Sequence, residues 1–327
     1  MNTTNSTALL EELRPWSRAE KSLLVAVLSV EMVLGILGNT LVLIVKIVCK
    51  YHFQCVHWLP LVSLTLSDLS CSVLIISGSL LATLTGGQRS PWCEVVSLFK
   101  FTFMTSSIGS IAILCVQRFM GIRSTGSCWS VIMVLACFTS WLFGVVFGIV
   151  PVIYGWIKYD SAEMLCAVFW ESVYSDMLVY ILCAFSVCVF LPFLLMLICS
   201  LLSAAGYGKH GNNPDDLSSV APLLVVFYLL CYTPFAVSEL ILLGRLDLSP
   251  SPEWLRTVSS VLAYMDCGLN PILYCTNQDF RQALLALLWT SRKLSLSEPE
   301  LTRITKLVMV KSQPAEIITI AQMKVPS

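Results

Sequence analysis

The chain has 327 residues, of which 57% are hydrophobic and only 12% are charged, and its 20 basic residues balance its 20 acidic residues. An average soluble domain carries about twice that share of charged residues. A soluble globular fold could not bury so large an apolar surface, so the composition excludes that class of protein. The zero net charge also excludes nucleic acid as a partner, since no field of one sign is present to attract it. A lipid bilayer is therefore the predicted solvent for much of the chain.

The first 21 residues form a polar tail, which we expect to be extracellular. It contains the acceptor sequences Asn2-Thr3-Thr4 and Asn5-Ser6-Thr7, which predict glycosylation of Asn2 and Asn5. The tail does not resemble a cleaved signal peptide, because no small-residue cleavage site follows a short apolar core. The first apolar helix is thus expected to act as an uncleaved anchor.

Seven apolar stretches follow, each long enough to cross a hydrocarbon core of about 30 Å. They run over Ser22–Val48, Trp58–Leu84, Cys93–Ile122, Trp129–Ile153, Val173–Ser203, Leu217–Leu243 and Trp254–Cys275. Inside lipid every backbone polar group needs an internal partner, so stretches of this length are helices. Residues 22–275 therefore predict a seven-transmembrane helix bundle, and no connection is long enough for a second domain.

Residues 276–290 predict a short amphipathic eighth helix that lies along the membrane surface. Its expected membrane-facing residues are Phe280, Leu284, Leu287 and Leu288, with Arg281 pointing away. Residues 291–327 form a polar tail, which an odd number of spans places in the cytoplasm. The predicted fold class is thus an all-α membrane protein with seven spanning helices and a short eighth helix.

Each apolar stretch contains a residue pattern that is unusual for a helix facing lipid. In order these are Gly38-Asn39, Leu66-Ser67-Asp68-Leu69, Cys93 with Gln117-Arg118-Phe119, Trp141, Pro192, Cys231-Tyr232-Thr233-Pro234, and Asn270-Pro271-Ile272-Leu273-Tyr274. Together, one set per stretch, they resemble the motifs of rhodopsin-like (class A) G-protein-coupled receptors over about residues 20–290. The resemblance implies a plasma-membrane receptor that transduces an extracellular ligand to heterotrimeric G proteins. No nucleophile elbow, zinc signature or phosphate loop predicts an enzyme.

Asp68 is predicted to lie in the middle of the membrane, where an ionised carboxylate costs at least about 2.5 kcal/mol. The polar residues that we expect to meet it inside the bundle are Asn39, Ser107, Asp266 and Asn270. Such an oxygen cluster suits a sodium ion, acting as an allosteric modulator, or a proton. The alternative is a polar cluster that only fixes packing. No other cofactor is expected.

The resemblance also assigns switching roles to Arg118 and Tyr274. Pro234 and Pro271 each remove a backbone hydrogen bond and permit a bend, which lets helices repack between two arrangements. The alternative interpretation is that proline is simply tolerated in membrane helices. Cys93 and Cys166 are the two cysteines best placed on the oxidising face, and a disulfide between them would pin the loop after the fourth stretch over the bundle.

Three positions depart from the family's pattern. Gln117 replaces the acid that normally pairs with the arginine, although Asp215 and Asp216 offer another restraint, and Tyr232 and Ser200 replace a usual Trp and Tyr. A receptor with raised basal activity and a relative that has lost coupling both fit these departures. A transporter or channel is a further alternative, which the absence of internal repeats disfavours.

The ligand pocket departs as well. Lys100 stands seven residues past Cys93, where aminergic receptors place an Asp, and Tyr264 stands six residues before Asn270, where opsins hold the retinal-bearing Lys. Neither an amine nor retinal is therefore expected as the ligand.

Lys100 is predicted to lie about 10 Å inside Cys93, at 1.5 Å of rise per residue, where its charge needs compensation. One interpretation pairs it with Glu239, which we favour, or with Glu31. The other makes it the anchor for an acidic ligand group, in a pocket lined by Phe103, Tyr232 and Tyr264. Both hold if a ligand anion displaces Glu239.

Overall fold

The computed structural model describes residues 16–48, 58–120, 127–168, 174–207, 220–244 and 252–293. The chain divides into two compact units, residues 1–281 and residues 282–327. Asn2, Asn5, Asp215 and Asp216 lie outside the described residues, so their predicted roles stay predictions.

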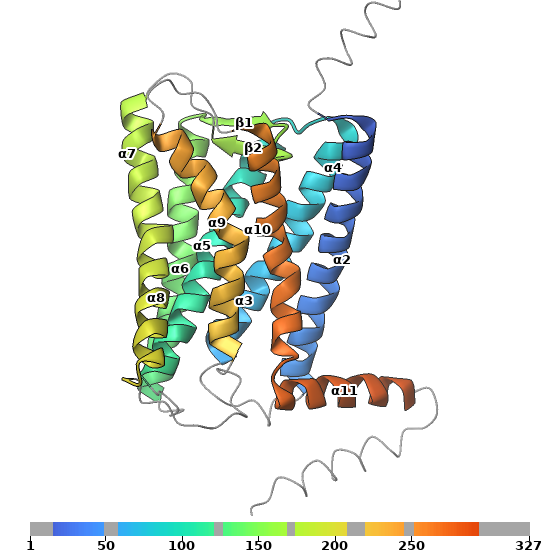
Figure 1. Ribbon diagram of the computed structural model, residues 1–327, viewed down its shortest axis with the longest axis vertical. Coiled ribbons are helices and arrows are strands. Elements are labelled where there is room, and N and C mark those ends of the chain that lie inside the picture. The colour runs from blue at the N-terminus through green and yellow to red at the C-terminus, as the bar shows by residue number, and fades with distance from the viewer. Residues whose placement is uncertain are drawn as a thin grey trace, which may run out of the picture. The chain divides into compact units, whose positions relative to one another are not determined.

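The helices of the described part of the first unit run side by side as rods (Figure 1), and the element order gives seven of them. In chain order they are α2 (Arg18–Val48), then α3 (Trp58–Ser70), η1 (Cys71–Ile76) and α4 (Ser77–Thr85) in one rod, α5 (Trp92–Phe119), α6 (Ser127–Ile153), then α7 (Tyr174–Phe185), η2 (Ser186–Phe190) and α8 (Leu191–Ala204) in one rod, α9 (Ala221–Gly244) and α10 (Glu253–Tyr274). This arrangement confirms the predicted seven-helix bundle.

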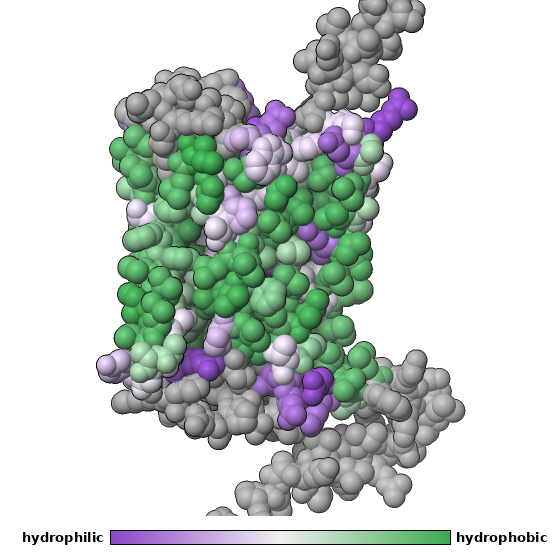
Figure 2. All heavy atoms as spheres, viewed as in Figure 1, coloured by the Kyte–Doolittle hydropathy of each residue, from purple (hydrophilic) through white to green (hydrophobic). Residues whose placement is uncertain are grey.

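Six of these rods are long and apolar enough to span a membrane, and α10 is not among them. The helix carries polar residues, such as Thr257, Ser259 and Asp266, that are buried inside the bundle. Figure 2 shows the complementary surface, where hydrophobic side chains cover the sides of α2, α7, α8 and α9. Polar residues on α10 thus face other helices, which explains why this predicted apolar stretch is less apolar than the other six.

Local chemistry sets two features that differ from the predicted spans. Helix α2 begins four residues before the predicted Ser22, because Ser17 and Glu20 form a reciprocal capping box with N–H···O distances of 3.3 and 2.8 Å. The second and fifth rods each contain a π-helical turn, η1 and η2, which the sequence did not predict. Pro192, just after η2, lacks a backbone N–H to donate to the preceding turn, which favours a local widening there.

Helix α5 runs through the centre of the bundle, because 67% of its most apolar 18-residue segment is buried. The corresponding share for α6 is 22%. The two helices touch closely at Gly144, where a Cβ atom would lie 2.7 Å from the Cα of Thr102. Trp141 of α6 donates its indole N–H to the hydroxyl of Ser63 at 3.0 Å, and Ser110 of α5 donates to the same oxygen at 2.8 Å. Small and hydroxyl-bearing residues therefore hold α3, α5 and α6 together.

A β-hairpin covers one end of the bundle. Strands β1 (Ile157–Asp160) and β2 (Leu165–Val168) pair antiparallel, with Ile157 opposite Val168 and Asp160 opposite Leu165. A disulfide joins Cys166 of β2 to Cys93 at the start of α5, with a Cα–Cα distance of 5.4 Å. The predicted Cys93–Cys166 pair is thus present, and it ties the hairpin to the central helix.

Helix α11 (Gln278–Lys293) follows α10. The side-chain oxygen of Asn277 accepts a hydrogen bond from the backbone N–H of Phe280 at 3.0 Å, which caps the first turn. The prediction that Phe280 faces the membrane is wrong: its ring is buried and packs edge-on against Tyr274, with ring centroids 6.0 Å apart.

Candidate functional site: a cavity beneath the hairpin and a buried polar cluster

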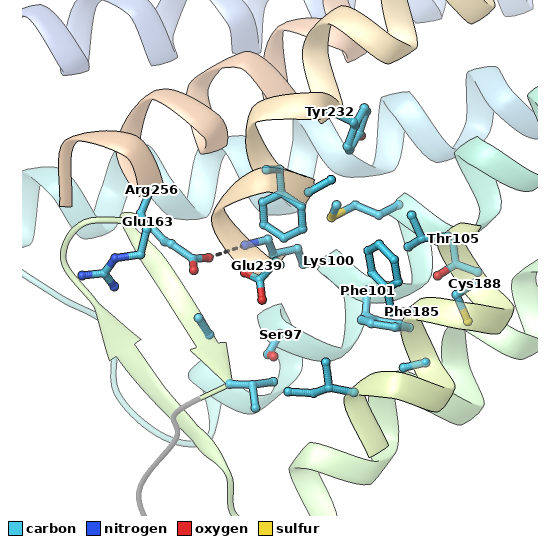
Figure 3. Close-up of a pocket in the computed structure, with 18 of the residues that line it drawn as sticks. Ser97, Lys100, Phe101, Thr105, Glu163, Phe185, Cys188, Tyr232, Glu239 and Arg256 are labelled. Carbon is cyan, nitrogen blue, oxygen red and sulfur yellow. Dashed lines mark hydrogen bonds and ion pairs between the residues drawn. The ribbon is translucent and has the colours of Figure 1, made fainter. Parts of the chain in front are cut away.

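A cavity of about 510 Å³ lies beneath the β-hairpin, among α5, α7, η2 and α9. Its apolar lining includes Phe101, Met104, Phe185, Phe193, Tyr228 and Tyr232. Figure 3 shows Phe101 and Phe185 on one side of this space and Tyr232 on another. The volume is typical of sites for small molecules, and we call this region the open half of the hairpin end.

The other half of the hairpin end is filled by the turn between β1 and β2. Met164 and Leu165 are almost completely buried in a hydrophobic cluster that includes Leu28 of α2, Phe103 of α5 and Tyr264 of α10. The structure thus corrects the predicted pocket lining, because Phe103 and Tyr264 belong to this filled half and do not line the cavity. The hydroxyl of Tyr264 accepts a hydrogen bond from Ser79 at 3.2 Å.

Lys100 lines the cavity and has an internal partner that the sequence interpretation missed. Its Nζ lies 2.7 Å from Oε2 of Glu163 in the hairpin turn, and both side chains are largely buried. The ion pair predicted with Glu239 or Glu31 is therefore made with Glu163 instead. The disulfide explains this contact: Lys100 lies seven residues past Cys93, and Glu163 lies three residues before Cys166, so the crosslink brings them together. That pair of spacings was readable in the sequence.

A second ion pair joins Asp160 of β1 to Arg256 of α10. Asp160 also accepts a hydrogen bond from the backbone N–H of Ala162 at 2.9 Å, and Thr257 donates to the carbonyl of Ala162 at 2.7 Å. Burial raises the pKa of Asp160, the neighbouring Glu163 raises it further, and Arg256 opposes both effects. The hairpin turn is thus held to α10 by contacts independent of the disulfide.

Glu239 of α9 lines the cavity close to both charges of the Lys100–Glu163 pair. Figure 3 shows its carboxylate beside Lys100, on the cavity side of the Lys100–Glu163 contact. Among the described residues it makes no hydrogen bond or ion pair. The ring of Phe235, one turn earlier on α9, lies 5.6 Å from the Lys100 ammonium.

A buried polar cluster lies deeper in the bundle, around Asp68. The amide of Asn270 donates to Asp68 at 2.8 Å and to Asp266 at 3.4 Å. The amide of Asn39 instead donates to the backbone carbonyls of Gly35 and Cys267, both at 2.9 Å, so its N–H groups join α2 to α10 and do not reach the carboxylates. Asp68, Asp266 and Asn270 are thus brought together as predicted.

The cluster has more acceptor oxygens than donors. The buried oxygens without a hydrogen-bond partner are Oδ1 of Asn39, Oγ of Ser107, Oδ1 of Asp266 and Oδ1 of Asn270. Oxygen-rich sites of this kind suit hard cations. No group of three or more His, Cys, Asp or Glu side chains able to hold a metal occurs among the described residues. Two carboxylates with neutral oxygens are consistent with a sodium ion.

Arg118, Pro271 and Tyr274 lie toward the opposite end of the bundle from the hairpin, whereas Pro234 lies next to Thr233 and Phe235, which line the cavity. Arg118 is in the last turn of α5, and the neighbouring Gln117 is completely buried with neither amide atom hydrogen-bonded to a described residue. Pro234 and Pro271 lie inside α9 and α10, and the hydroxyl of Tyr274 is buried without a partner there. Buried polar groups without a hydrogen-bond partner are unusual in a packed bundle.

Comparison with known proteins decides the family. Residues 38–274 match the family model described as "7 transmembrane receptor (rhodopsin family)". The chain belongs to this family. Rhodopsin-family proteins of this kind are receptors rather than enzymes, and the chain is accordingly a multi-pass membrane protein and a G-protein-coupled receptor by family.

Individual relatives of this receptor are distant and varied. It is 22% identical to the visual pigment-like receptor peropsin of Mus musculus over 90% of this chain and 93% of peropsin. It is 26% identical to formyl peptide receptor-related sequence 6 of Mus musculus over 89% of this chain and 91% of that one. The crystal structure of squid rhodopsin shares the fold, with a TM-score of 0.70 at 19% identity and coverage of 97% and 95%.

Proposed function

We propose that the receptor lies in the plasma membrane with its N-terminus and β-hairpin outside, binds an extracellular ligand in the open half, and activates a heterotrimeric G protein at the opposite end. The observation that carries this proposal is the cavity of about 510 Å³ beneath a hairpin that is tied down at Cys166 and at Ala162. A small molecule that enters it contacts α5 and α9 together, so binding can bias how these helices pack.

Light sensing is not proposed, although peropsin is named a visual pigment-like receptor. Tyr264 stands where the resemblance would require the retinal-bearing Lys, and its hydroxyl is bonded to Ser79. An acidic ligand, the class that Lys100 predicts, would have to share Lys100 with Glu163 or displace Glu163 from it. The ligand is therefore proposed to meet a polar rim and an apolar floor within one cavity.

The polar cluster around Asp68 is proposed to connect the two ends of the bundle. A sodium ion bound by Asp68, with Ser107, Asp266 and Asn270 near it, would stabilise one packing of the helices. Pro234 and Pro271 permit the bends that the other packing requires. Arg118 is then the residue that we expect to face the G protein.

The test is G-protein activation in cells that express the full chain, measured without ligand and against a small-molecule library. We expect activation of at least one G-protein class and a strong loss of it in Arg118→Ala at equal surface expression. A well-expressed receptor that activates no G protein under any condition would favour a non-signalling relative.

Basal activity is a second property that one observation favours. Gln117 is buried, with neither amide atom hydrogen-bonded to a described residue, at the position where the family's acid adds an ion pair to the neighbouring arginine. We therefore expect measurable signalling without ligand and expect Gln117→Glu to lower it, because the acid adds one ion pair to the contacts that Arg118 already makes. Unchanged or higher basal signalling in Gln117→Glu would contradict a missing restraint.

A further inference from the structure

Six charged side chains line the cavity, and their pairing is unequal. The cations are Lys100, Lys158 and Arg256, and the carboxylates are Asp160, Glu163 and Glu239. Two ion pairs, Lys100–Glu163 and Asp160–Arg256, account for four of them. Lys158 is exposed on β1, where water screens its charge. Glu239 is the cavity carboxylate that makes no ion pair or hydrogen bond with a described residue, although Lys100 and Arg256 are close enough to attract it.

We propose that this cavity takes a ligand with a cationic head group, an ammonium, that binds Glu239, and with an apolar or aromatic body that fills the space between α5, α7 and α9. The proposal rests on the proposed function, since it names the ligand class for the same cavity. The three charges Lys100, Glu163 and Glu239 sum to −1, and one ligand cation neutralises them. Lys100 on α5 therefore does not exclude an amine ligand. The carboxylate that binds the amine is Glu239 on α9.

The same charge balance weighs against an acid. A ligand carboxylate at Lys100 would place a third carboxylate, beside Glu163 and Glu239, around a single ammonium, and would change the net charge of this group from −1 to −2. Unpaired charges at partly buried positions are costly, whereas an ammonium at Glu239 leaves both existing ion pairs intact. Glu239, the cavity carboxylate without an ion-pair partner among the described residues, thus selects the ligand head group, and Lys100 does not.

The surroundings of Glu239 define the body of the ligand. Phe235 lies one turn below it, and Tyr232 and Tyr228 stack on each other below that, with ring centroids 4.3 Å apart. Aromatic faces attract a cation and pack against flat apolar groups. The volume of about 510 Å³ admits a small molecule and excludes a folded domain.

The experiment compares three probes with one body and different head groups: 3-phenylpropylamine, 3-phenylpropan-1-ol and 3-phenylpropanoic acid. Binding to the purified full chain in lipid nanodiscs is measured by ligand-observed NMR. We expect the amine to bind about tenfold more tightly than the alcohol, because an ammonium adds Coulomb attraction to the Glu239 carboxylate that a hydroxyl lacks, and the acid to bind most weakly. Equal binding of all three, or tightest binding of the acid, overturns the proposal.

Variants locate the effect. Glu239→Gln should remove the advantage of the amine over the alcohol, whereas Glu239→Asp should keep part of that advantage. The matched control is Glu253→Gln, which removes an exposed carboxylate of α10 that does not line the cavity. An amine advantage that persists in a folded Glu239→Gln overturns the proposal. If Glu239→Gln does not fold, the probe comparison on the unmodified chain and on Glu239→Asp still decides.

Failure of this inference is distinguishable from failure of the proposed function. The binding measurement needs no G protein, so retained amine selectivity in a receptor that activates no G protein defeats only the proposed function. Conversely, strong G-protein activation by an uncharged or acidic agonist, with a potency that Glu239→Gln leaves unchanged, defeats only the cationic head group.

Discussion

The two halves of the hairpin end differ in what fills them, although one loop covers both. In the filled half, Met164 of the hairpin turn and Leu165, the first residue of β2, complete a hydrophobic cluster with Leu28 and Tyr264. In the open half, the side chains of α5, α7 and α9 face an empty space of about 510 Å³. The difference shows that the loop acts as core on one side and as a cover on the other. Ligand selectivity is therefore decided by the open half.

Removing the disulfide is expected to disturb both halves and to have the largest effect. A crosslink between Cys93 and Cys166, 73 residues apart, belongs to a class that stabilises small domains by about 2–5 kcal/mol. We expect Cys93→Ala and Cys166→Ala each to cut surface expression and thermal stability strongly. Cys183→Ala is the control, because Cys183 is an exposed free thiol on α7. Wild-type behaviour of both disulfide variants would show that the hairpin stays in place without the bridge.

Truncating one apolar side chain in each half should separate them. Leu165→Ala opens a void in the filled half, and large-to-small changes in a packed core cost about 2–5 kcal/mol. Ile181→Ala changes a side chain of similar size that already faces the cavity, so we expect a smaller loss. The measurement is the unfolding temperature of purified receptor in one detergent. Equal losses would mean that the two halves are equally packed.

The charged rim where the halves meet can be tested by a double-mutant cycle. We expect Lys100→Gln and Glu163→Gln to show a coupling energy within the range of about 0.5–3 kcal/mol found for residues in contact. The matched cycle of Lys100→Gln with Glu239→Gln should give a smaller value, because no ion pair joins those two side chains. A larger coupling with Glu239 would return Lys100 to the partner that the sequence first suggested.

Asp68 lies deeper in the bundle than both halves. We expect Asp68→Asn to have the smallest effect on packing, because Asn has nearly the volume of Asp. If sodium binds among the unpaired oxygens around Asp68, added sodium chloride should raise the unfolding temperature of wild type more than potassium chloride does. Asp68→Asn should abolish that difference, and Asp176→Asn at the start of α7 should preserve it. A sodium effect that survives in Asp68→Asn would favour a cluster that only fixes packing.

The amino-acid sequence by itself determined the features that depend on local composition and spacing. Long apolar stretches require helices in lipid, and one motif residue per stretch identified the family even for α10, whose polar residues weaken its hydropathy. The disulfide followed from the position of Cys93 and Cys166 relative to these stretches. Asp68, Asp266 and Asn270 were brought together as expected, because their places along helices of known length fix their depth.

Only the tertiary structure decided what each inward-facing residue contacts. Helical periodicity indicates which face points inward, but it contains no information about a loop that inserts side chains between helices. Met164 and Leu165 therefore removed Phe103 and Tyr264 from the predicted pocket, and Glu163 replaced Glu239 as the partner of Lys100. Each of these contacts joins residues far apart in the chain and depends on how the hairpin folds over the bundle, which no local pattern fixes.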